Sequence, residues 1–277
     1  MKVVLFCGGF GMRLRGYVDA VPKPLVEIGN WPIMIHIMKY YACFGHKDFI
    51  LCLGWKADVI RHYFEEILET NSSGIIEKTS GISRAEISTW NINLVDTGLH
   101  SSIGERLKHL EDDLRDEQCF LANYTDGLCN VDLNALTAHH NQSGAVASFV
   151  SVRPTHSFHV INSNESGQVT DVSALTDKDL WMNGGFFTMS GEIFQFLNEG
   201  EELVEKPFQR LIREGRLSTY RHDDFWSCMD TYKEMQALEE AYERGESPWE
   251  VWKKQHRPVF KLRRSEDPIR RGGVCEL

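Results

Sequence analysis

The sequence predicts an α/β fold, and two kinds of segment support that prediction. Residues 2–7 are apolar apart from one lysine, and residues 48–53 are apolar apart from one aspartate, without the alternation of a half-exposed strand. Such runs are typical of strands that are buried on both faces of a sheet. Segments with apolar residues at helical spacing, 31–44 and 55–70, follow these strands. The β-loop-α-β-α order favours a Rossmann-like, doubly wound and mostly parallel central sheet.

The turn after the first strand has the composition of an anion-binding loop. Gly8, Gly9 and Gly11 let backbone N–H groups approach a ligand closely, because no Cβ intervenes. Arg13 and Lys23 add two cations, and prolines on both sides of Lys23 fix the chain around it. These features indicate a polyphosphate site. The alternative is an ordinary strand-to-helix turn with incidental basic residues.

Two better-known glycine loops do not match this stretch. A P-loop closes with Lys-Ser or Lys-Thr, and neither pair follows these glycines. A dinucleotide fingerprint has a third glycine where this chain has Leu14. In that motif the second strand ends in an acid, whereas here it ends in Leu53-Gly54. The loop therefore predicts phosphate binding of another kind.

Periodicity and turn residues predict the next elements. Pro32 suits a first helical turn, and His36 is expected in the core or at a cap rather than as a base. Residues 71–90 are polar and poorly periodic, which predicts a loop or a hairpin over the site. The pair His139-His140 is expected at the surface. The other elements expected here are strands at 91–96, 119–123 and 145–152 and helices at 103–114 and 132–140.

From Arg153 to about residue 215 the chain becomes richer in short strands, which predicts a smaller β-rich part. We expect one domain over residues 1–255 and a basic tail over 256–277 that is disordered or packs on a neighbouring subunit. The elements expected after Arg153 are strands at 158–162, 168–172, 184–189 and 217–221 and helices at 191–198, 204–214 and 232–244.

Composition narrows the classes of protein. The chain has 277 residues and a net charge of −10, so a broad surface for binding nucleic acid is not expected. A local cationic pocket for a small anionic ligand is still expected. No apolar run approaches the roughly 20 residues that span a membrane. The start is too short and too rich in glycine for a signal peptide. The seven cysteines form no CxxC pair, which favours free thiols in a cytoplasmic protein.

The motif GGFGMRL at 8–14, followed by PKPLVEIGNWPI at 22–33, resembles the signature of the sugar-1-phosphate nucleotidyltransferases. Within them it is most similar to the glucose-1-phosphate cytidylyltransferases. The resemblance covers about the first 250 residues in order and at compatible spacing, and it is therefore specific. Its further matching segments are 48–63, 95–107, 124–132, 181–187 and 225–231.

The resemblance implies a nucleotide site around the first loop. The family pattern Thr-Gly-Gly-Arg corresponds to Ile103-Gly104-Glu105-Arg106, in which Gly104 and Arg106 match. A solvated helix charge is the alternative for Arg106. CTP is the favoured triphosphate, although Leu99, Ile103 and Glu105 alter the base-side pattern. The nucleotide-binding residues implied in this way are Phe6, Cys7, Gly8, Gly9, Gly11, Met12, Gly104 and Arg106.

The resemblance also implies a Mg²⁺ site. The family motif Tyr-Gly-Asp-Gly matches at Asp126, with Thr125 in place of a glycine, and Trp-x-x-Met-Asp-Thr matches at Asp230. The aspartates of both motifs bind the metal in the family. The alternatives are a turn-forming Asp-Gly pair at Asp126 and a helix N-cap at Asp230.

The acceptor side departs from the family pattern. Asn183 and Gly184 match the motif Trp-Ile-Asn-Gly-Gly-Phe-Phe, whose asparagine contacts sugar or phosphate. The family motif Gln-Glu-Lys-Pro is missing, and by position Ala174 and Leu175 replace its glutamate and lysine. Lys178 is the candidate substitute for the lost lysine if the loop shifts.

A second departure lies upstream. A family Phe-Gly that lies against the sugar has become Ser157-Phe158-His159. His159 is therefore an acceptor-side candidate, and together with Leu175 it is expected to narrow the pocket.

These residues predict Mg²⁺-dependent nucleotidyl transfer with release of pyrophosphate. Arg13 would balance charge on the pyrophosphate, and Lys23 would lie at the α-phosphate or the attacking phosphate. We consider three hypotheses: a cytidylyltransferase for a phosphorylated acceptor other than plain glucose 1-phosphate, an ordinary sugar-1-phosphate nucleotidyltransferase, and a non-catalytic nucleotide-binding regulator. Both acids together with both cations argue against the regulator. A homo-oligomer is expected.

Overall fold

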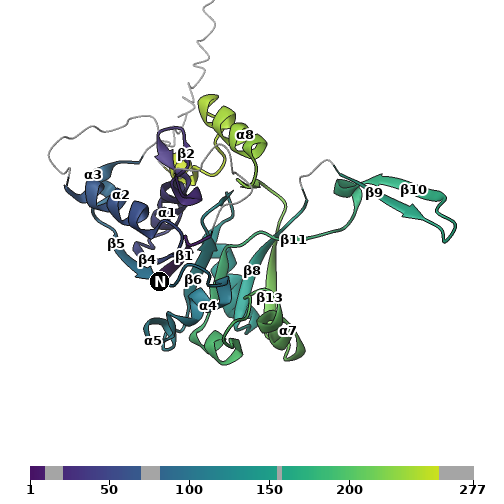
Figure 1. Ribbon diagram of the computed structural model, residues 1–277, viewed down its shortest axis with the longest axis horizontal. Helices are drawn as coiled ribbons and strands as arrows, with labels where there is room; N and C mark the ends of the chain where they lie inside the picture. Colours follow the sequence, from purple (N-terminus) through teal and green to yellow (C-terminus); the bar gives the residue numbers. More distant parts are fainter. Residues whose placement is uncertain (10–20, 70–81, 155–157, 256–277) are drawn as a thin grey trace, which may run out of the picture.

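The computed structural model describes residues 1–9, 21–69, 82–154 and 158–255 (Figure 1). Gly11, Met12 and Arg13, most of the expected loop at 71–90, and the basic tail lie outside the described residues. Among the helices in the described part of the chain, none is long and apolar enough to cross a membrane.

One eight-stranded sheet organises the molecule. Its order is β11-β8-β12-β6-β1-β4-β5, and β13 pairs with β8. Strand β1 lies between β4 and β6 and is parallel to both, and β5 is parallel to β4. The strand β12 is antiparallel to β6 and β8, so the sheet is mixed. The bounds are β1 Lys2–Phe6, β4 Asp48–Leu53, β5 Asn91–Asp96, β6 Phe120–Tyr124, β8 Ala147–Val152, β11 Met182–Asn183, β12 Phe187–Met189 and β13 Leu217–His222.

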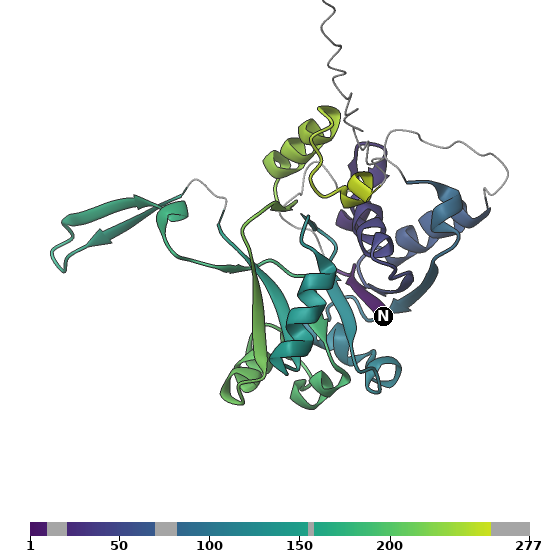
Figure 2. The same cartoon turned by 180° about the vertical axis from the view of Figure 1, so that it is seen from behind.

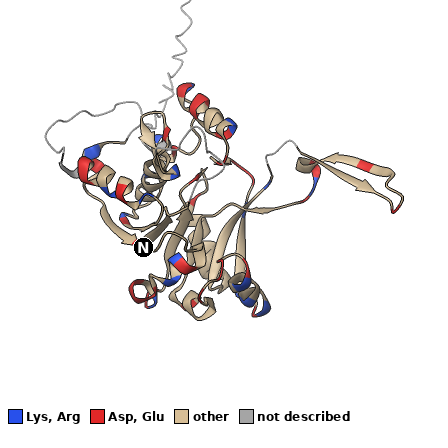
Figure 3. Cartoon of the chain, in the orientation of Figure 1, with Lys and Arg blue, Asp and Glu red and all other residues tan. Residues whose placement is uncertain are grey.

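Helices cover both faces of the sheet, which confirms the α/β prediction (Figures 1 and 2). Val3 and Leu5 point into one core and Val4 and Phe6 into the other, which explains why the first strand shows no alternation. Charged residues are more frequent on helices such as α2, α7 and α8 than on the central sheet (Figure 3). The helices are α1 Ile33–Cys43, α2 Ala57–Glu69, α3 Arg84–Ile87, α4 Ile103–Lys108, α5 Glu111–Leu114, α6 Leu133–Ser143, α7 Lys206–Arg213, α8 Tyr232–Glu243 and α9 Val251–Gln255. The 3₁₀ turns are η2 Lys23–Leu25, η3 Leu175–Asp177 and η4 Gly191–Phe196.

Several local predictions need correction. The helix expected at 103–114 is two helices, because the chain leaves helical geometry at Leu110 (φ −99°, ψ 12°) without a glycine or proline to reveal it. The segment expected to be a loop or a hairpin contains the helix α3, whose N-cap Ser83 accepts a hydrogen bond from the Glu86 amide. Pro32 stands at the N-cap of α1 rather than in its first turn.

Of the two histidines expected at the surface, His139 is half-buried, with its Nε2 2.8 Å from the hydroxyl of Ser218, whereas His140 is buried. His140 is 4% exposed, and its Nδ1 lies 2.9 Å from the hydroxyl of Ser148, so it belongs to the packing between α6 and β8. His36 lies in the core, as predicted. Five short strands were not expected: β2 Glu27–Ile28, β3 Trp31–Pro32, β7 Gly127–Cys129, β11 Met182–Asn183 and β14 Trp226–Cys228.

The β-rich part is mainly a two-stranded arm. Strands β9 His159–Ser163 and β10 Val169–Ala174 form an antiparallel hairpin that projects from the body (Figures 1 and 2). Ile161 and Val172 are opposite each other on it and are 60% and 56% exposed. The other short strands of this region, β11 and β12, join the central sheet.

Candidate active site

Lys23 lies between two carboxylates at the carboxyl edge of the parallel strands. Its Nζ is 2.7 Å from Oδ2 of Asp126 and 2.6 Å from Oδ1 of Asp230. The lysine begins the turn η2, where Pro22 (φ −65°) and Pro24 restrict the backbone. The structure therefore brings together three residues that sequence reasoning selected from distant motifs.

The antiparallel pairing of the short strands β7 and β14 places the two aspartates side by side. Asp126 follows β6, and the next residue, Gly127, pairs with Cys228 in the β7/β14 ladder. The amide of Met229 donates to the carbonyl of Asp126 at 2.8 Å. Backbone pairing thus fixes the spacing of the two carboxylates before any ligand arrives.

The helix that follows Asp230 is capped by its neighbour. Thr231 is the N-cap of α8 and forms a capping box with Glu234, whose carboxylate accepts from the amides of Asp230 and Thr231. The N-cap alternative for Asp230 is therefore wrong, and its carboxylate is directed to Lys23 instead. The turn-former alternative for Asp126 likewise does not explain its contact with Lys23.

The electrostatics of this cluster favour one cation held by two anions. The Lys23 side chain is 13% exposed, and burial opposes its charge. The two carboxylates outweigh that opposition, so the pKa of Lys23 is raised above its ordinary value. Because both aspartates reach the same ammonium, they can converge on one cation, and Mg²⁺ is commonly held by one or two carboxylates together with substrate phosphates. Within the described residues no group of three or more His, Cys, Asp or Glu could hold a metal without such help.

The first loop is described at Gly8 and Gly9, and Arg106 holds it in place. Arg106 is 2% exposed, and its guanidinium donates to the carbonyls of Gly8, Leu53 and Gly98 at 3.0, 2.9 and 2.9 Å. It also donates to the hydroxyl of Thr97 at 2.8 Å. Burial lowers the pKa of Arg106. The solvated-charge alternative for Arg106 is wrong, and a direct contact with nucleotide stays a prediction.

The other nucleotide-side candidates are placed as follows. The side chains of Phe6 and Cys7 are buried, and the Cys7 amide already donates to the carbonyl of Cys52 at 2.9 Å. A Cβ added to Gly104 would lie 2.2 Å from the carbonyl oxygen of Glu201, so this glycine allows close backbone contact. Gly9 is exposed, and no atom of the described residues lies within 4 Å of a Cβ added there, which suits a close approach by a ligand.

The acceptor-side candidates do not gather at one place. The side-chain amide of Asn183 donates to the hydroxyl of Tyr124 at 3.3 Å, near Asp126. The amide of Gly184 is already used, since it donates to the carbonyl of Val150 at 2.8 Å. Lys178 lies at the base of the arm with its Nζ 3.6 Å from Asp171.

His159 lies on the arm and does not narrow a pocket with Leu175 as expected. It is exposed on β9, opposite Ala174. Because β9 and β10 project from the body, this pair lies on the arm and not in the packed core (Figures 1 and 2).

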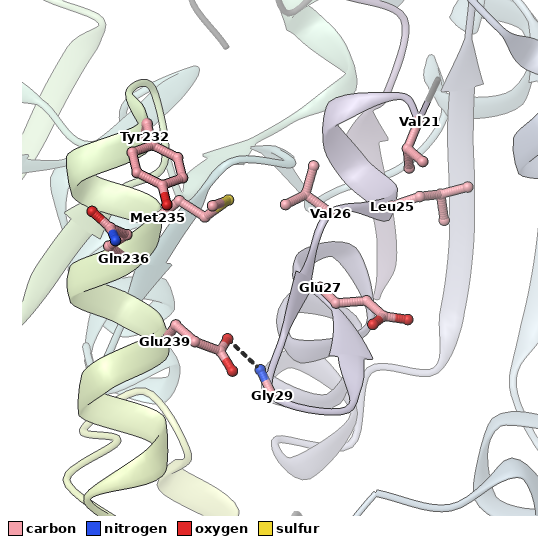
Figure 4. A pocket seen from close by; sticks show the side chains of 9 residues that line it. All are labelled: Val21, Leu25, Val26, Glu27, Gly29, Tyr232, Met235, Gln236 and Glu239. Carbon is pink, nitrogen blue, oxygen red and sulfur yellow. Dashed lines mark hydrogen bonds between the residues drawn. The ribbon is translucent and has the colours of Figure 1, made fainter. Parts of the chain in front are cut away.

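A cavity of about 580 Å³, which sequence reasoning missed, adjoins the segment that carries Lys23 and the helix that follows Asp230 (Figure 4). It lies between the segment from Val21 to Gly29 and the helix α8, and the carboxylate of Glu239 accepts from the amide of Gly29 at 2.7 Å across it. No local motif marks this cavity, because its two walls are about 200 residues apart in the chain.

The fold and this site define an α/β enzyme class that handles phosphorylated ligands at the carboxyl edge of its sheet. The family model described as nucleotidyl transferase matches residues 2–244. The chain belongs to this nucleotidyl transferase family and is an enzyme similar to its cytidylyltransferases.

Two curated relatives illustrate that similarity. The probable glucose-1-phosphate cytidylyltransferase of Bacillus subtilis (strain 168) is 34% identical over 256 residues, covering 91% of this chain and all of the relative. The glucose-1-phosphate cytidylyltransferase of Salmonella typhi is 34% identical over 257 residues with the same coverage. Among solved structures, a UDP-glucose pyrophosphorylase complexed with UDP-glucose superposes with a TM-score of 0.67 at 13% identity, covering 88% of this chain and 98% of the other. That likeness concerns the fold alone.

Proposed function

We propose that this protein transfers a cytidylyl group from CTP to a phosphorylated small molecule and releases pyrophosphate in a Mg²⁺-dependent reaction. The observation that carries the proposal is the placement of Lys23 within 2.7 Å of both Asp126 and Asp230. The hydroxyl of Thr125, next to Asp126, donates to the carbonyl of Phe6 at the end of β1, which leads into the glycine turn. The two relatives named glucose-1-phosphate cytidylyltransferase support CTP as the triphosphate.

Nucleotidyl transfer depends mainly on positioning the reacting phosphates and on neutralising their negative charge. A phosphate oxygen of the acceptor forms a new bond to the α-phosphorus while the bond from that phosphorus to the bridging oxygen breaks, and the electron pair leaves with pyrophosphate. The attacking group is already an anion, so no general base is needed. In the proposal the Gly8 and Gly9 backbone holds the triphosphate, and Lys23 neutralises the reacting phosphates.

Asp126 and Asp230 would hold the metal. Their carboxylates face one cation in the structure, which supports this assignment. When bound there, Mg²⁺ would supply further positive charge at the reacting phosphate. Arg13 keeps its proposed role at the pyrophosphate and lies outside the described residues.

We further propose that the acceptor is not plain glucose 1-phosphate. Ala174 and Leu175 stand where the family has an acid and a lysine, and they lie at the base of the projecting arm. A site without those polar partners would bind glucose 1-phosphate poorly. The second candidate is an ordinary glucose-1-phosphate cytidylyltransferase in which Lys178 serves as the phosphate contact. The ion pair of Lys178 with Asp171 on the arm counts against it.

The test is a pyrophosphate-release screen that crosses CTP, UTP, ATP, GTP and dTTP with a panel of phosphorylated sugars, polyols and amino acids. We expect turnover with CTP and with at least one acceptor other than glucose 1-phosphate. The matched control is Asp126→Asn, which should remove the signal for every productive pair. Pyrophosphate release by that variant at the wild-type rate would contradict the site.

We propose a cytoplasmic location and self-association. The six cysteines in the described residues are free, and free thiols are typical of a reducing compartment. Exposed Ile161 and Val172 on a two-stranded arm support a homo-oligomer, because such a ribbon is only marginally stable alone. Light scattering on the purified full-length chain tests this, and the molar mass of a monomer would contradict it.

A further inference from the structure

A second cavity, of about 410 Å³, lies on the sheet between β11, β8, β13 and α7. Its apolar wall includes Phe149 and Phe208, and its polar wall includes Ser151, Asn183 and Arg221. The indole of Trp181 lies at the same cavity. A concave apolar site with a few polar groups is the usual form of a small-molecule pocket.

Strand register puts the polar groups in one row. Ser151 on β8 is paired with Asn183 on β11 and with Arg221 on β13. Residues opposite one another on neighbouring strands point to the same face of a sheet. The hydroxyl, the amide and the guanidinium are therefore presented together, which their separation in the sequence conceals.

Ser151 supplies an unsatisfied hydrogen-bonding group. The residue is 3% exposed, and its Oγ has no hydrogen-bond partner among the residues that the structure describes. Buried hydroxyls are normally paired, and leaving one unpaired is unfavourable. A ligand group in the cavity would satisfy it.

Arg221 supplies a charge without a carboxylate. Its guanidinium lies 5.0 Å from the centre of the Trp181 ring, and within the described parts of the chain it forms neither an ion pair nor a hydrogen bond. Arg153 lies over the same ring at 4.6 Å but is paired with Asp179 and Asp223. Both arginines contact the indole, but only Arg221 lacks a carboxylate partner among the described residues, so its guanidinium can bind an external anion.

One hydrogen bond links the lining of this cavity to strand β6, which leads to the active-site edge. Asn183 lines the cavity, and its amide donates to the hydroxyl of Tyr124 at 3.3 Å. Tyr124 is the last residue of β6, two positions before Asp126. A molecule whose phosphate reacts near Asp126 can therefore extend past Asn183 toward Arg221.

We propose that this cavity binds the distal end of the acceptor and that Arg221 recognises an oxyanion there, either a carboxylate or a second phosphate. This inference rests on the proposed function and deepens it. Ser151 and Asn183 bind polar groups along the acceptor, and Trp181 packs against its body. The acceptor class is a phosphorylated molecule with a second anionic group, which compensates for the acid and the lysine missing at Ala174 and Leu175.

The experiment compares acceptors that differ by one anionic group. The probes are glucose 1-phosphate against glucuronic acid 1-phosphate and glucose 1,6-bisphosphate, and glycerol 3-phosphate against 3-phosphoglycerate. Binding to the full-length protein is measured by calorimetry in EDTA, and kcat/KM is measured with CTP and Mg²⁺. We expect at least one probe that carries the second anionic group to bind about tenfold or more tightly than the matching probe without it. Preference for a carboxylate or for a phosphate identifies which oxyanion is used.

Three variants locate that preference. Arg221→Met should abolish the preference, so that both probes of a pair bind with about equal affinity. Arg221→Lys keeps a positive charge and should restore part of the preference. The matched control Arg153→Gln removes the other guanidinium from the same indole and should keep the preference. Ser151→Ala should weaken the binding of both probes in each pair by the same factor.

Two results would overturn the inference: wild-type protein that binds the members of every pair equally, or an Arg221→Met variant that keeps the preference. Failure of the proposed function would look different, since it would abolish pyrophosphate release with all acceptors while the binding preference could still be measured. Equal effects of Arg221→Met and Arg153→Gln would show that Arg221 only braces Trp181.

Discussion

The guanidinium of Arg106 donates to the carbonyl of Gly8 at 3.0 Å, and this contact joins helix α4 to the turn after β1. A Cβ added at Gly8 would lie 2.2 Å from Nη1 of Arg106. The glycine at this position therefore serves the fit of a buried arginine as well as the approach of a ligand. The next glycine differs, because a Cβ at Gly9 would meet nothing within 4 Å among the residues that the structure describes.

Gly8→Ala and Gly9→Ala should separate these two effects. Gly8→Ala overpacks the Arg106 contact and should lower the free energy of unfolding by about 1–3 kcal/mol. Gly9→Ala should leave the stability of the ligand-free protein unchanged and should weaken CTP binding. Urea unfolding and calorimetric titration with CTP provide the two measurements. Equal stability of both variants would contradict the packing argument.

Asp126→Asn and Asp230→Asn should each lower kcat by about 10²- to 10³-fold without unfolding the protein. Each variant removes one of the two carboxylates that meet at Lys23. Initial rates at several Mg²⁺ concentrations test this, with circular dichroism as the check on folding. The exposed Asp113→Asn is the matched control and should behave as wild type. Near-wild-type turnover by either site variant would remove that residue from the proposed metal site.

Lys23→Met should affect the metal-free protein as well as catalysis. Without the ammonium, Asp126 and Asp230 face each other unneutralised, so the protein in EDTA should lose roughly 1–3 kcal/mol of stability, a value reduced for partial exposure. Mg²⁺ should raise the Tm of the variant more than that of wild type. We also expect kcat to fall much more than CTP affinity, because the cation acts on charge that shifts in the transition state. A pure loss of CTP affinity would place Lys23 on the β- and γ-phosphates.

We expect the protein to lose stability in mild acid because His36 becomes protonated there. Burial lowers its pKa to about 4, with a smaller contribution from the charge of Lys253. Its Nε2 lies 2.9 Å from the carbonyl of Ile28, and Trp249 donates to its Nδ1 at 3.3 Å, which fixes the neutral Nε2–H form. A depressed pKa means that the stabilisation is complete above the unfolded value of about 6.5 and is lost as pH falls toward 4.

The expected loss between pH 6.5 and pH 4 is about 3 kcal/mol from this residue. His46, whose pKa is also lowered to about 4, titrates in the same window. The test therefore compares wild type with His36→Gln, so that other groups cancel. The variant should be less stable at pH 7 and should change less as the pH falls. Parallel curves for the two proteins would show that His36 does not carry the effect.

Local motifs predicted the residues that meet at Lys23, because each motif fixes its own residue at a strand end. The pattern of buried strands likewise predicted the parallel half of the sheet. The Ser151, Asn183 and Arg221 row was not predictable in that way, since it depends on the register among three strands. The break between α4 and α5 was missed because no glycine or proline marks it.

The arm was missed for a related reason. The short strands β9 and β10 were expected near their observed positions, but periodicity does not say that a hairpin leaves the body. The assignment of His159 to a tight pocket with Leu175 assumed that both lay against the core. Only the pairing and placement of β9 and β10 could have shown that His159 is exposed.

Glucose 1-phosphate should be a poor acceptor. Loss of a charged phosphate contact costs roughly 1.5–3 kcal/mol, and loss of a hydroxyl contact adds to it, because Ala174 and Leu175 offer neither group. The expected decrease in kcat/KM is on the order of 10²- to 10⁴-fold relative to the preferred acceptor. Competition between the two acceptors with CTP and Mg²⁺ measures that ratio directly. A kcat/KM for glucose 1-phosphate above about 10⁴ M⁻¹s⁻¹ would contradict the prediction. In that case Lys178→Ala becomes the decisive variant, because only release of Lys178 from Asp171 could supply the missing phosphate contact from this loop.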